Sequence, residues 1–523
     1  MNIIKNNTYF NCSKVFWKIG VLITAILCLI ANTVFASSDT IILARGGDST
    51  TMDLHKTSRS VDYQVMDSIY GNLMALDLDG NVSPNYAESM TVSDDGLTYR
   101  FTMREGIKCH DGTPFDAAAV KWNFDRATDP EIANPMASRY GDIAESYVEG
   151  NVYVLKLKSA FSALPAYAGE MPIMCPSSIQ GDEVTPIGAG PWKFVSWDRG
   201  NEIILERNED YVNYNPLVKN PGPPYMKRLI WKVIPEATAR MAALKAGEVT
   251  FMEPSLPDAA ALINSSEFKM DTAPLSAQKP YLGFTTGIAP FNDVRARRAI
   301  AHVINRQQIA DIAFEGLVKP NYCPISPGLF GHNEEFCKKH APEYDPEKAK
   351  SILAELGYNS NNPLEIILQT GVSDGWGKTL EVIQQQLSDI GVKSSIEYTG
   401  WGEFRTSIQE RNLATEGTPV VWMGGMSGVD PDYVVFLWTF PGGPQNQGID
   451  NADLQQLLLD QRTTTGAARL EVLNDIQKFL LENAYEVLLV SPGWSFLTLY
   501  KSNVEGFQRK HVVIPIFNDV KIN

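Results

Sequence analysis

The sequence lacks the residue patterns on which the common hydrolases rely. It contains no His-Glu-x-x-His stretch, which zinc peptidases need, and no Gly-x-Ser-x-Gly turn, which serine hydrolases need. The nearest candidate, Gly425-Met426-Ser427-Gly428, has the wrong spacing. An exported hydrolase or peptidase stays open as an alternative, and it would need a nucleophile–base pair that the sequence does not reveal.

Long hydrophobic runs are also absent, apart from residues 19–30 in a basic N-terminal segment without acidic residues. A run of this length fits the core of a secretory signal peptide and is short for a membrane span of about 20 residues. Val34-Phe35-Ala36 fits the small-x-small pattern at which such signals are cleaved. We predict a cleaved signal peptide over residues 1–36, with an uncleaved anchor helix as the alternative.

Cysteine and histidine are scarce, with six of each in the chain. Only Cys323, His332, Cys337 and His340 cluster, and a disulfide between these two cysteines would remove the thiolates that a metal needs. We expect that disulfide, which closes a loop of 13 residues and contributes about 3 kcal/mol by loop-closure reasoning. Neither a metal nor another cofactor is expected.

The other two cysteines outside the signal segment, Cys109 and Cys175, have no spacing that decides whether they pair.

Basic residues are outnumbered, with 45 Lys and Arg against 61 Asp and Glu. The formal charge of −16 becomes more negative by three when the lysines of the signal segment are removed. Such a surface argues against nucleic acid and anionic lipid as partners.

The sequence from Gly371 to Lys378 is similar to a phosphate-binding loop but does not match its pattern. The span from Gly371 to Gly377 is one residue longer than the P-loop pattern allows, so a turn between a strand and a helix is the simpler interpretation. The start of that helix and Lys378 together could nevertheless hold an anionic group of a ligand.

Residues 86–130 carry the clearest local pattern. Ser93-Asp94-Asp95-Gly96 indicates a hairpin turn, and Leu97, Tyr99 and Phe101 alternate with polar residues as in a strand. Asp116 is placed to cap the following helix. Further along, helices and strands alternate, which favours a mostly parallel sheet with covering helices; one long helix is expected over residues 292–314.

The sequence of residues 86–130 resembles the signature of the cluster C extracellular solute-binding proteins, the peptide- and nickel-type receptors of ABC importers. The corner Gly188-Ala189-Gly190-Pro191-Trp192 resembles a second common stretch of this family, which often has Thr in place of Ala189. The similarity recurs in order along the chain, over residues 70–130, 186–211, 229–251, 281–309 and 344–391.

The resemblance implies an α/β fold with two lobes, the type II periplasmic binding protein fold of cluster C, with an extra subdomain in the first lobe. We expect lobe I over residues 37–282, its extra subdomain over about 75–185, lobe II over 283–490 and a return to lobe I over 491–523. Such a protein is not an enzyme. A monomer in the periplasm would close by hinge motion around a small solute or peptide and deliver it to an inner-membrane permease and its ATPase.

Residues that reach the cleft between the lobes are indicated by the family pattern and, for Trp401 and Trp422, by their places after strands, where α/β proteins hold ligands. Ordinary packing in the core or between the lobes stays open as the alternative for each Trp. We expect the ligand to contact Asp48, Gly188, Ala189, Trp192, Lys378, Trp401, Trp422, Met426, Asp430 and Tyr433. Dipeptide receptors carry an Asp slightly upstream of the Asp430-Pro431-Asp432-Tyr433 run to bind the α-ammonium, and that place falls on Ser427 or Gly428 here.

Asp430 could take over the role of that missing carboxylate. Oligopeptide-like ligands are the first expectation; an opine, a sugar conjugate, glutathione or a metal chelate remain open, as does a chaperone or adhesin on the same fold.

Overall fold

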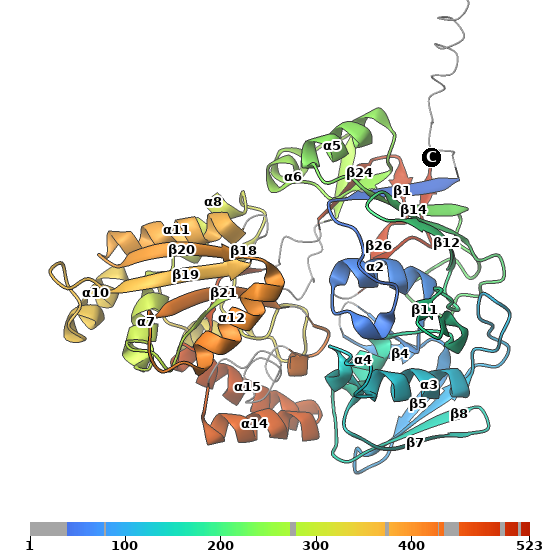
Figure 1. Ribbon diagram of the computed structural model, residues 1–523, viewed down its shortest axis with the longest axis horizontal. Helices are drawn as coiled ribbons and strands as arrows, with labels where there is room; N and C mark the ends of the chain where they lie inside the picture. The colour runs from blue at the N-terminus through green and yellow to red at the C-terminus, as the bar shows by residue number, and fades with distance from the viewer. Residues whose placement is uncertain are drawn as a thin grey trace, which may run out of the picture.

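The computed structural model describes residues 39–77, 80–271, 279–371, 376–426, 428–433, 449–491, 497–510 and 514–523. The expected signal peptide lies outside these residues. The elements form two lobes that lie side by side, lobe I on the right and lobe II on the left in Figure 1.

Lobe I is built on a seven-stranded sheet in the order β12-β13-β14-β1-β15-β24-β16. β1 (Thr40–Arg45) lies at its centre and pairs in parallel with both β14 and β15. The other strands are β12 (Trp192–Asp198), β13 (Glu202–Arg207), β14 (Arg228–Val233), β15 (Phe251–Met252), β16 (Phe268–Asp271) and β24 (Thr498–Lys501).

The central strand β1 is buried on both faces, which explains its almost continuous apolar sequence. Ile41 and Leu43 pack in one hydrophobic cluster with the inward side of α2 (Ser60–Ile69). Ala44 packs on the opposite face with α5 (Ala237–Ala246). A further helix of lobe I is α6 (Leu256–Leu262).

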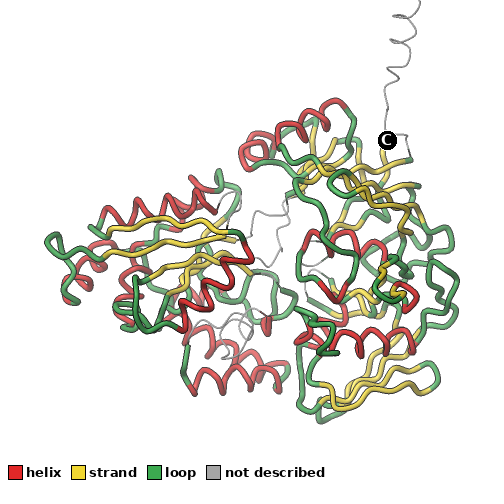
Figure 2. Tube along the Cα trace, in the orientation of Figure 1, coloured by secondary structure: helices red, strands yellow, loops and turns green. Residues whose placement is uncertain are grey.

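The extra subdomain is an antiparallel sheet of four strands in the order β5-β6-β8-β7, and α3 (Ala117–Thr128) packs against one of its faces (Figure 2). The hairpin expected from the turn at residues 93–96 is formed by β5 and β6, and Asp116 caps α3 by accepting the amides of Ala118 and Ala119. The strands are β5 (Ala87–Val92), β6 (Thr98–Met103), β7 (Ile143–Glu149) and β8 (Val152–Leu157).

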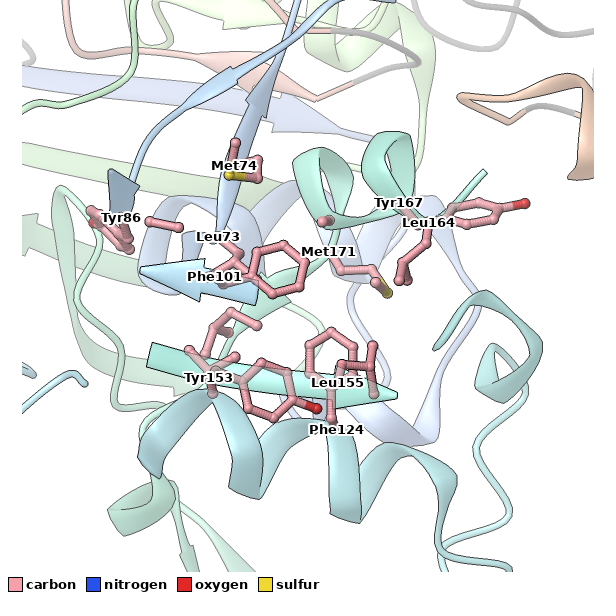
Figure 3. Packing of buried hydrophobic residues seen from close by; sticks show 14 of the residues in the cluster. Leu73, Met74, Tyr86, Phe101, Phe124, Tyr153, Leu155, Leu164, Tyr167 and Met171 are labelled. Atoms are coloured by element: carbon pink, nitrogen blue, oxygen red, sulfur yellow. The ribbon is translucent and has the colours of Figure 1, made fainter. Parts of the chain in front are cut away.

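The core of the subdomain lies between this sheet, α3 and the short helix α4 (Leu164–Glu170) (Figure 3). Phe101, Phe124 and Tyr153 meet at its centre, with ring centroids 5.0 Å apart between Phe124 and Tyr153. Tyr167 lies at the edge of the cluster, with its hydroxyl directed away from Phe101.

Lobe II is built on a five-stranded sheet in the order β20-β19-β21-β17-β22. β19 pairs in parallel with β20 and β21, whereas β17 is antiparallel to β21. The strands are β17 (Lys279–Phe284), β19 (Glu365–Gly371), β20 (Lys393–Thr399), β21 (Val420–Met426) and β22 (Val487–Leu488).

Helices cover both faces of this sheet. α11 (Trp376–Asp389) packs on the face that carries Leu368 and Val421, and α12 (Trp401–Leu413) packs on the face that carries Val420 and Trp422. The remaining helices are α7 (Val294–Val303), α8 (Arg306–Ala313), α9 (Glu334–His340), α10 (Pro346–Glu355), α14 (Ala452–Thr463) and α15 (Gly466–Glu482).

The single helix expected over residues 292–314 is in fact two helices, α7 and α8. The chain leaves helical geometry at Ile304, and the side chain of Asn305 accepts the Gln308 amide to begin α8. The apolar spacing was right, but a capping Asn inside the run stopped the helix.

None of the described helices is long and apolar enough to cross a membrane.

The described chain also contains several short strands that pair two by two. The paired short strands are β2 (Gly71–Asn72) with β9 (Pro172–Ile173), β3 (Met74–Leu76) with β4 (Val82–Pro84), β10 (Ile179–Gln180) with β11 (Glu183–Val184), β18 (Lys319–Pro320) with β23 (Val490–Ser491), β25 (Val504–Glu505) with β28 (Lys521–Ile522), and β26 (Gln508–Arg509) with β27 (Pro515–Ile516).

The second sheet begins at Lys279, so the change from one sheet to the other falls before this residue. A boundary at 282/283 would divide β17, whose residues all belong to the sheet of lobe II. The return to lobe I from residue 491 and the bounds of the extra subdomain stay proposals.

Four cysteines form two disulfides. Cys323 pairs with Cys337 in lobe II, as the short loop between them indicates. Cys109 pairs with Cys175, across a sequence separation of 66 residues, and so connects the loop after β6 to the segment after β9. The sequence could not reveal this second pair because its partners meet only through the fold of the subdomain.

Removal of the Cys109–Cys175 disulfide should destabilise the protein more than removal of the Cys323–Cys337 disulfide. Loop-closure reasoning gives about 4 kcal/mol for the longer loop and about 3 kcal/mol for the shorter one. Denaturant unfolding of the two Cys→Ser double variants measures the difference. Free thiols at Cys109 or Cys175 in the oxidised wild-type protein would contradict the pairing.

Candidate functional site

The carboxyl ends of three parallel strands define the candidate site in lobe II. Because β20, β19 and β21 run in the same direction, the segments that follow them leave the sheet at one edge. Lys378 follows β19, Trp401 begins α12 after β20, and Met426 ends β21. The backbone thus brings together three of the expected ligand residues that are far apart in sequence; the side chains of Trp401 and Met426 lie outside the described residues.

Lys378 lies in the first turn of α11, where its ammonium is 2.9 Å from a carboxylate oxygen of Glu315. Both side chains are substantially exposed, so this pair contributes little to stability. The ammonium can therefore exchange Glu315 for an anionic ligand group at small cost.

Lys279 was missed by sequence reasoning, although it lies at the same edge of the sheet. It pairs with Met426 in the strand register, and its ammonium is 2.7 Å from Glu486. Both side chains are fully buried, and burial lowers the pKa of Lys279 while Glu486 opposes that shift. The pair places a matched positive and negative charge inside lobe II, and loss of either partner would remove this buried ion pair.

Trp422 belongs to the core of lobe II. Its indole is 1% exposed, donates to the side-chain oxygen of Asn412 at 3.1 Å and meets the ring of Tyr281 edge-on at 5.5 Å. A Cβ at Gly283 would lie 2.2 Å from the indole, so glycine at that position makes room for it. The indole is not accessible to a ligand, and the expectation that Trp422 contacts one has no support in this geometry.

The glycine-rich corner of lobe I packs against the end of α2. A Cβ on Gly188 would lie 2.2 Å from the carbonyl oxygen of Ile69, and one on Gly190 would lie 2.5 Å from the same atom. The hydroxyl of Tyr86 donates to the carbonyl of Ala189 at 2.6 Å, and Trp192 is 1% exposed in the lobe I core. Close packing within lobe I is thus enough to account for Gly188, Ala189 and Trp192.

Asp48 lies in the loop after β1, as expected, but its carboxylate is occupied within lobe I. It accepts the Trp197 indole N–H at 3.1 Å and the Gly200 amide at 2.8 Å, and it lies 3.7 Å from the guanidinium of Arg45. These contacts attach the loop to the β12–β13 hairpin and leave little capacity for a ligand ammonium.

Asp430 forms a buried ion pair with Arg469 of α15. The two side chains are 7% and 6% exposed, and one guanidinium nitrogen lies 2.9 Å from a carboxylate oxygen. Its charge is therefore neutralised inside lobe II. The signal that sequence reasoning missed is on α15, where Arg469 shares the inward face with Leu473, Ile476 and Leu480.

Asp432 is buried next to Asp430 and is also paired. It accepts the side-chain amide of Gln461 at 2.6 Å, and Arg462 lies 3.0 Å away. Burial raises the pKa of Asp432 to about 6, the Arg462 charge works against this, and the nearby Asp430 adds to it. Through these contacts the two aspartates attach the loop of residues 428–433 to α14 and α15.

Tyr433, at the end of this loop, faces lobe I. Its ring lies 4.9 Å from the guanidinium of Arg139, which is also 2.8 Å from Glu170 of α4. Tyr433 packs against the hydrophobic clusters of both lobes, so it lies at their junction.

The described residues contain no group of three or more His, Cys, Asp or Glu side chains that could hold a metal ion. The cluster seen in sequence is used otherwise. Cys323 and Cys337 form their disulfide, His332 bonds through Nδ1 to the carbonyl of Ile325, and His340 lies 2.9 Å from Glu482.

The fold and the site together define a two-lobed solute-binding protein. A family model described as bacterial extracellular solute-binding proteins, family 5 Middle, matches residues 81–448. The chain therefore belongs to family 5 of the bacterial extracellular solute-binding proteins, which are the substrate-binding components of ABC importers and are not catalytic. The resemblance found in the sequence is confirmed.

Individual relatives agree with this assignment. The chain is 29% identical over 411 residues to a glutathione-binding protein, GsiB, of Shigella dysenteriae, a match that covers 76% of this chain and 77% of that protein. NikA from Brucella suis, in complex with Fe(III)-EDTA, has a TM-score of 0.80 at 21% identity and covers 92% of this chain and 100% of its own.

AppA from Bacillus subtilis, in complex with a nonapeptide, has a TM-score of 0.77 at 22% identity and covers 92% of this chain and 99% of its own. The predicted α/β fold with two lobes is confirmed by these similarities.

Substitution of Trp422 by Ala should destabilise the protein by about 3–5 kcal/mol, because it opens a cavity in the lobe II core and removes the hydrogen bond from the indole to Asn412. Tyr398→Ala is the matched control, since Tyr398 is an exposed aromatic residue of the same sheet, 45% exposed. Its expected change is below about 1 kcal/mol. Denaturant unfolding measures the free energy of unfolding of both variants and of the wild type. An unchanged free energy in Trp422→Ala would place the indole outside the core.

Proposed function

We propose that this protein is a periplasmic receptor that binds a short peptide with free carboxylates, glutathione first among them, and delivers it to an inner-membrane permease and its ATPase. The observation that carries the proposal is the similarity to the glutathione-binding protein over three quarters of both chains. The ligand would lie between the lobes, at the edge where Lys378, Trp401 and Met426 meet.

The charges near this edge allow a ligand carboxylate to be bound. Asp430 and Asp432 are both neutralised by lobe II side chains, so neither is free to bind an α-ammonium. Lys378 is held only by an exposed pair and can meet a ligand carboxylate, with support from the positive end of α11. Glutathione carries two carboxylates, and Lys378 can meet one of them.

The remaining parts of the proposal follow the family. Closure of lobes I and II around the ligand would expose a surface that the permease recognises, and the receptor would act as a monomer. Trp401 and Tyr433 are the aromatic residues that we propose as walls of the cleft.

A search for ligands by thermal unfolding tests the proposal. Glutathione and S-methylglutathione should raise the melting temperature of ligand-free protein, because a ligand at 100 times its Kd stabilises by about 2.7 kcal/mol. The methylated compound has no thiol that could reduce the two disulfides. Trialanine, an opine, a sugar phosphate and a nickel–histidine chelate serve as competitors in the same screen. If only one of these four compounds stabilises the protein, that compound replaces glutathione as the proposed ligand. If no compound in the screen stabilises it, the result counts against the receptor function itself.

Lys378→Ala should weaken S-methylglutathione binding at least about tenfold, the effect of one charge-assisted hydrogen bond. Lys350→Ala is the control, because Lys350 has a similar exposure, 43% against 46%, and a Glu partner at 2.8 Å elsewhere on lobe II. Calorimetric titration measures both. Equal affinities of the two variants would remove Lys378 from the site.

A further inference from the structure

A set of side-chain and backbone contacts joins lobe II to the extra subdomain of lobe I. We call it the clasp and define it as Arg139, Phe161 and Ser162 of the subdomain with Val429, Tyr433, Gln461 and Arg462 of lobe II. Lys378, the cation that we propose for the ligand, is not part of it.

The clasp has an apolar half and a polar half. In the apolar half, Val429 of lobe II is 4% exposed and belongs to the hydrophobic cluster of the subdomain, and Tyr433 packs beside it. Separation of the lobes at this point would expose Val429 to water, and this cost does not depend on any ligand.

In the polar half, the chain of one lobe hydrogen-bonds the chain of the other. The amide of Ser162 donates to the carbonyl of Arg462 at 2.8 Å, and the Ser162 hydroxyl donates to the carbonyl of Gln461 at 3.0 Å. The guanidinium of Arg462 lies 4.2 Å from the centre of the Phe161 ring. These contacts fix the end of α14 against the segment that precedes α4.

The lobe II side of the clasp is rigid because buried charges hold it together. Arg469 pairs with Asp430, and Asp432 binds Gln461 and Arg462, so the loop that carries Val429 and Tyr433 moves with α14 and α15. On the lobe I side, the ion pair of Arg139 with Glu170 supports the surface on which Tyr433 lies.

From these contacts we propose that the clasp is a standing joint between the extra subdomain and lobe II, present with and without cargo, and that the lobes rotate about it during closure. A joint that persists keeps the lobes near their closed arrangement and raises the population that can bind ligand. Apart from Tyr433, which we also propose as a wall of the cleft, the residues of the clasp are then positioning residues, which set affinity without touching the ligand. The proposal does not depend on which ligand the protein carries.

Hydrogen exchange of the wild-type protein tests the joint without a substitution. The protein is unfolded in guanidinium chloride with its disulfides intact, dialysed free of small molecules and refolded. The Ser162 amide, whose acceptor is in the other lobe, is compared with the Lys158 amide, which donates to Asp142 within the subdomain at the same 2.8 Å.

The standing joint predicts that the Ser162 amide exchanges at least about 100-fold more slowly than an unprotected amide in the ligand-free protein, and that S-methylglutathione changes this rate less than about threefold. Exchange at the unprotected rate, with Lys158 still protected, would overturn the proposal. Protection that arises only after ligand is added would overturn it as well, since the contact would then belong to ordinary closure.

Cysteine cross-linking gives an independent measurement. Ser162→Cys with Arg462→Cys should form a disulfide in ligand-free protein, within about tenfold of the rate of the control pair Asn503→Cys with Asn523→Cys, whose backbones are joined by a 3.0 Å hydrogen bond inside lobe I. Peptide mapping identifies the bond formed. If only the control pair cross-links, the lobes separate at the clasp and the proposal is wrong; if the double variant fails to fold, hydrogen exchange of the wild type decides.

Discussion

The buried ion pair between Asp430 and Arg469 is the constraint on which the junction of the lobes depends. Asp430 follows the strand at whose end we place the ligand, and Arg469 belongs to the helix that forms the outer layer of lobe II. Because two charges in a nearly dry interior must stay together, the loop of residues 428–433, which carries Asp430, is held in one conformation. That conformation directs Val429 and Tyr433 toward lobe I.

Charge pairing inside each lobe also explains what the cleft can recognise. Asp48 is bonded to the β12–β13 hairpin and Asp430 to Arg469, so two of the charged residues that the sequence suggested for ligand binding support the scaffold. A receptor with few free charges must choose its cargo by shape and by aromatic contact as much as by ion pairing. The exposed Lys378 is an exception among the expected residues.

Much of the architecture was predictable from the sequence because it is encoded locally. The hairpin at residues 93–96, the Asp116 cap and the Cys323–Cys337 loop each depend on residues close together in the chain. The family resemblance supplied the two lobes. The break between α7 and α8 was missed because one Asn outweighed a continuous apolar pattern.

The site was harder to predict because side chains of the same type serve core and cleft. Trp192 and Trp422 lie in segments typical of ligand sites, yet both are buried, and only the packing against Ile69 or Gly283 reveals this. Asp430 could not be recognised as half of an ion pair, since its partner is 39 residues away on an amphipathic helix. The Cys109–Cys175 pair is likewise set by tertiary structure.

The position of β24 governs the order in which the chain can assemble. This strand, Thr498–Lys501, lies between β15 and β16 in the sheet of lobe I, and β16 is attached to the sheet only through it. Lobe II, by contrast, draws its sheet from one continuous stretch of chain, from β17 to β22. A ribosome must therefore have synthesised almost the whole polypeptide before the first lobe can close its sheet. The sheet of lobe I is thus completed only when nearly all of the chain has been made, whereas lobe II can fold earlier.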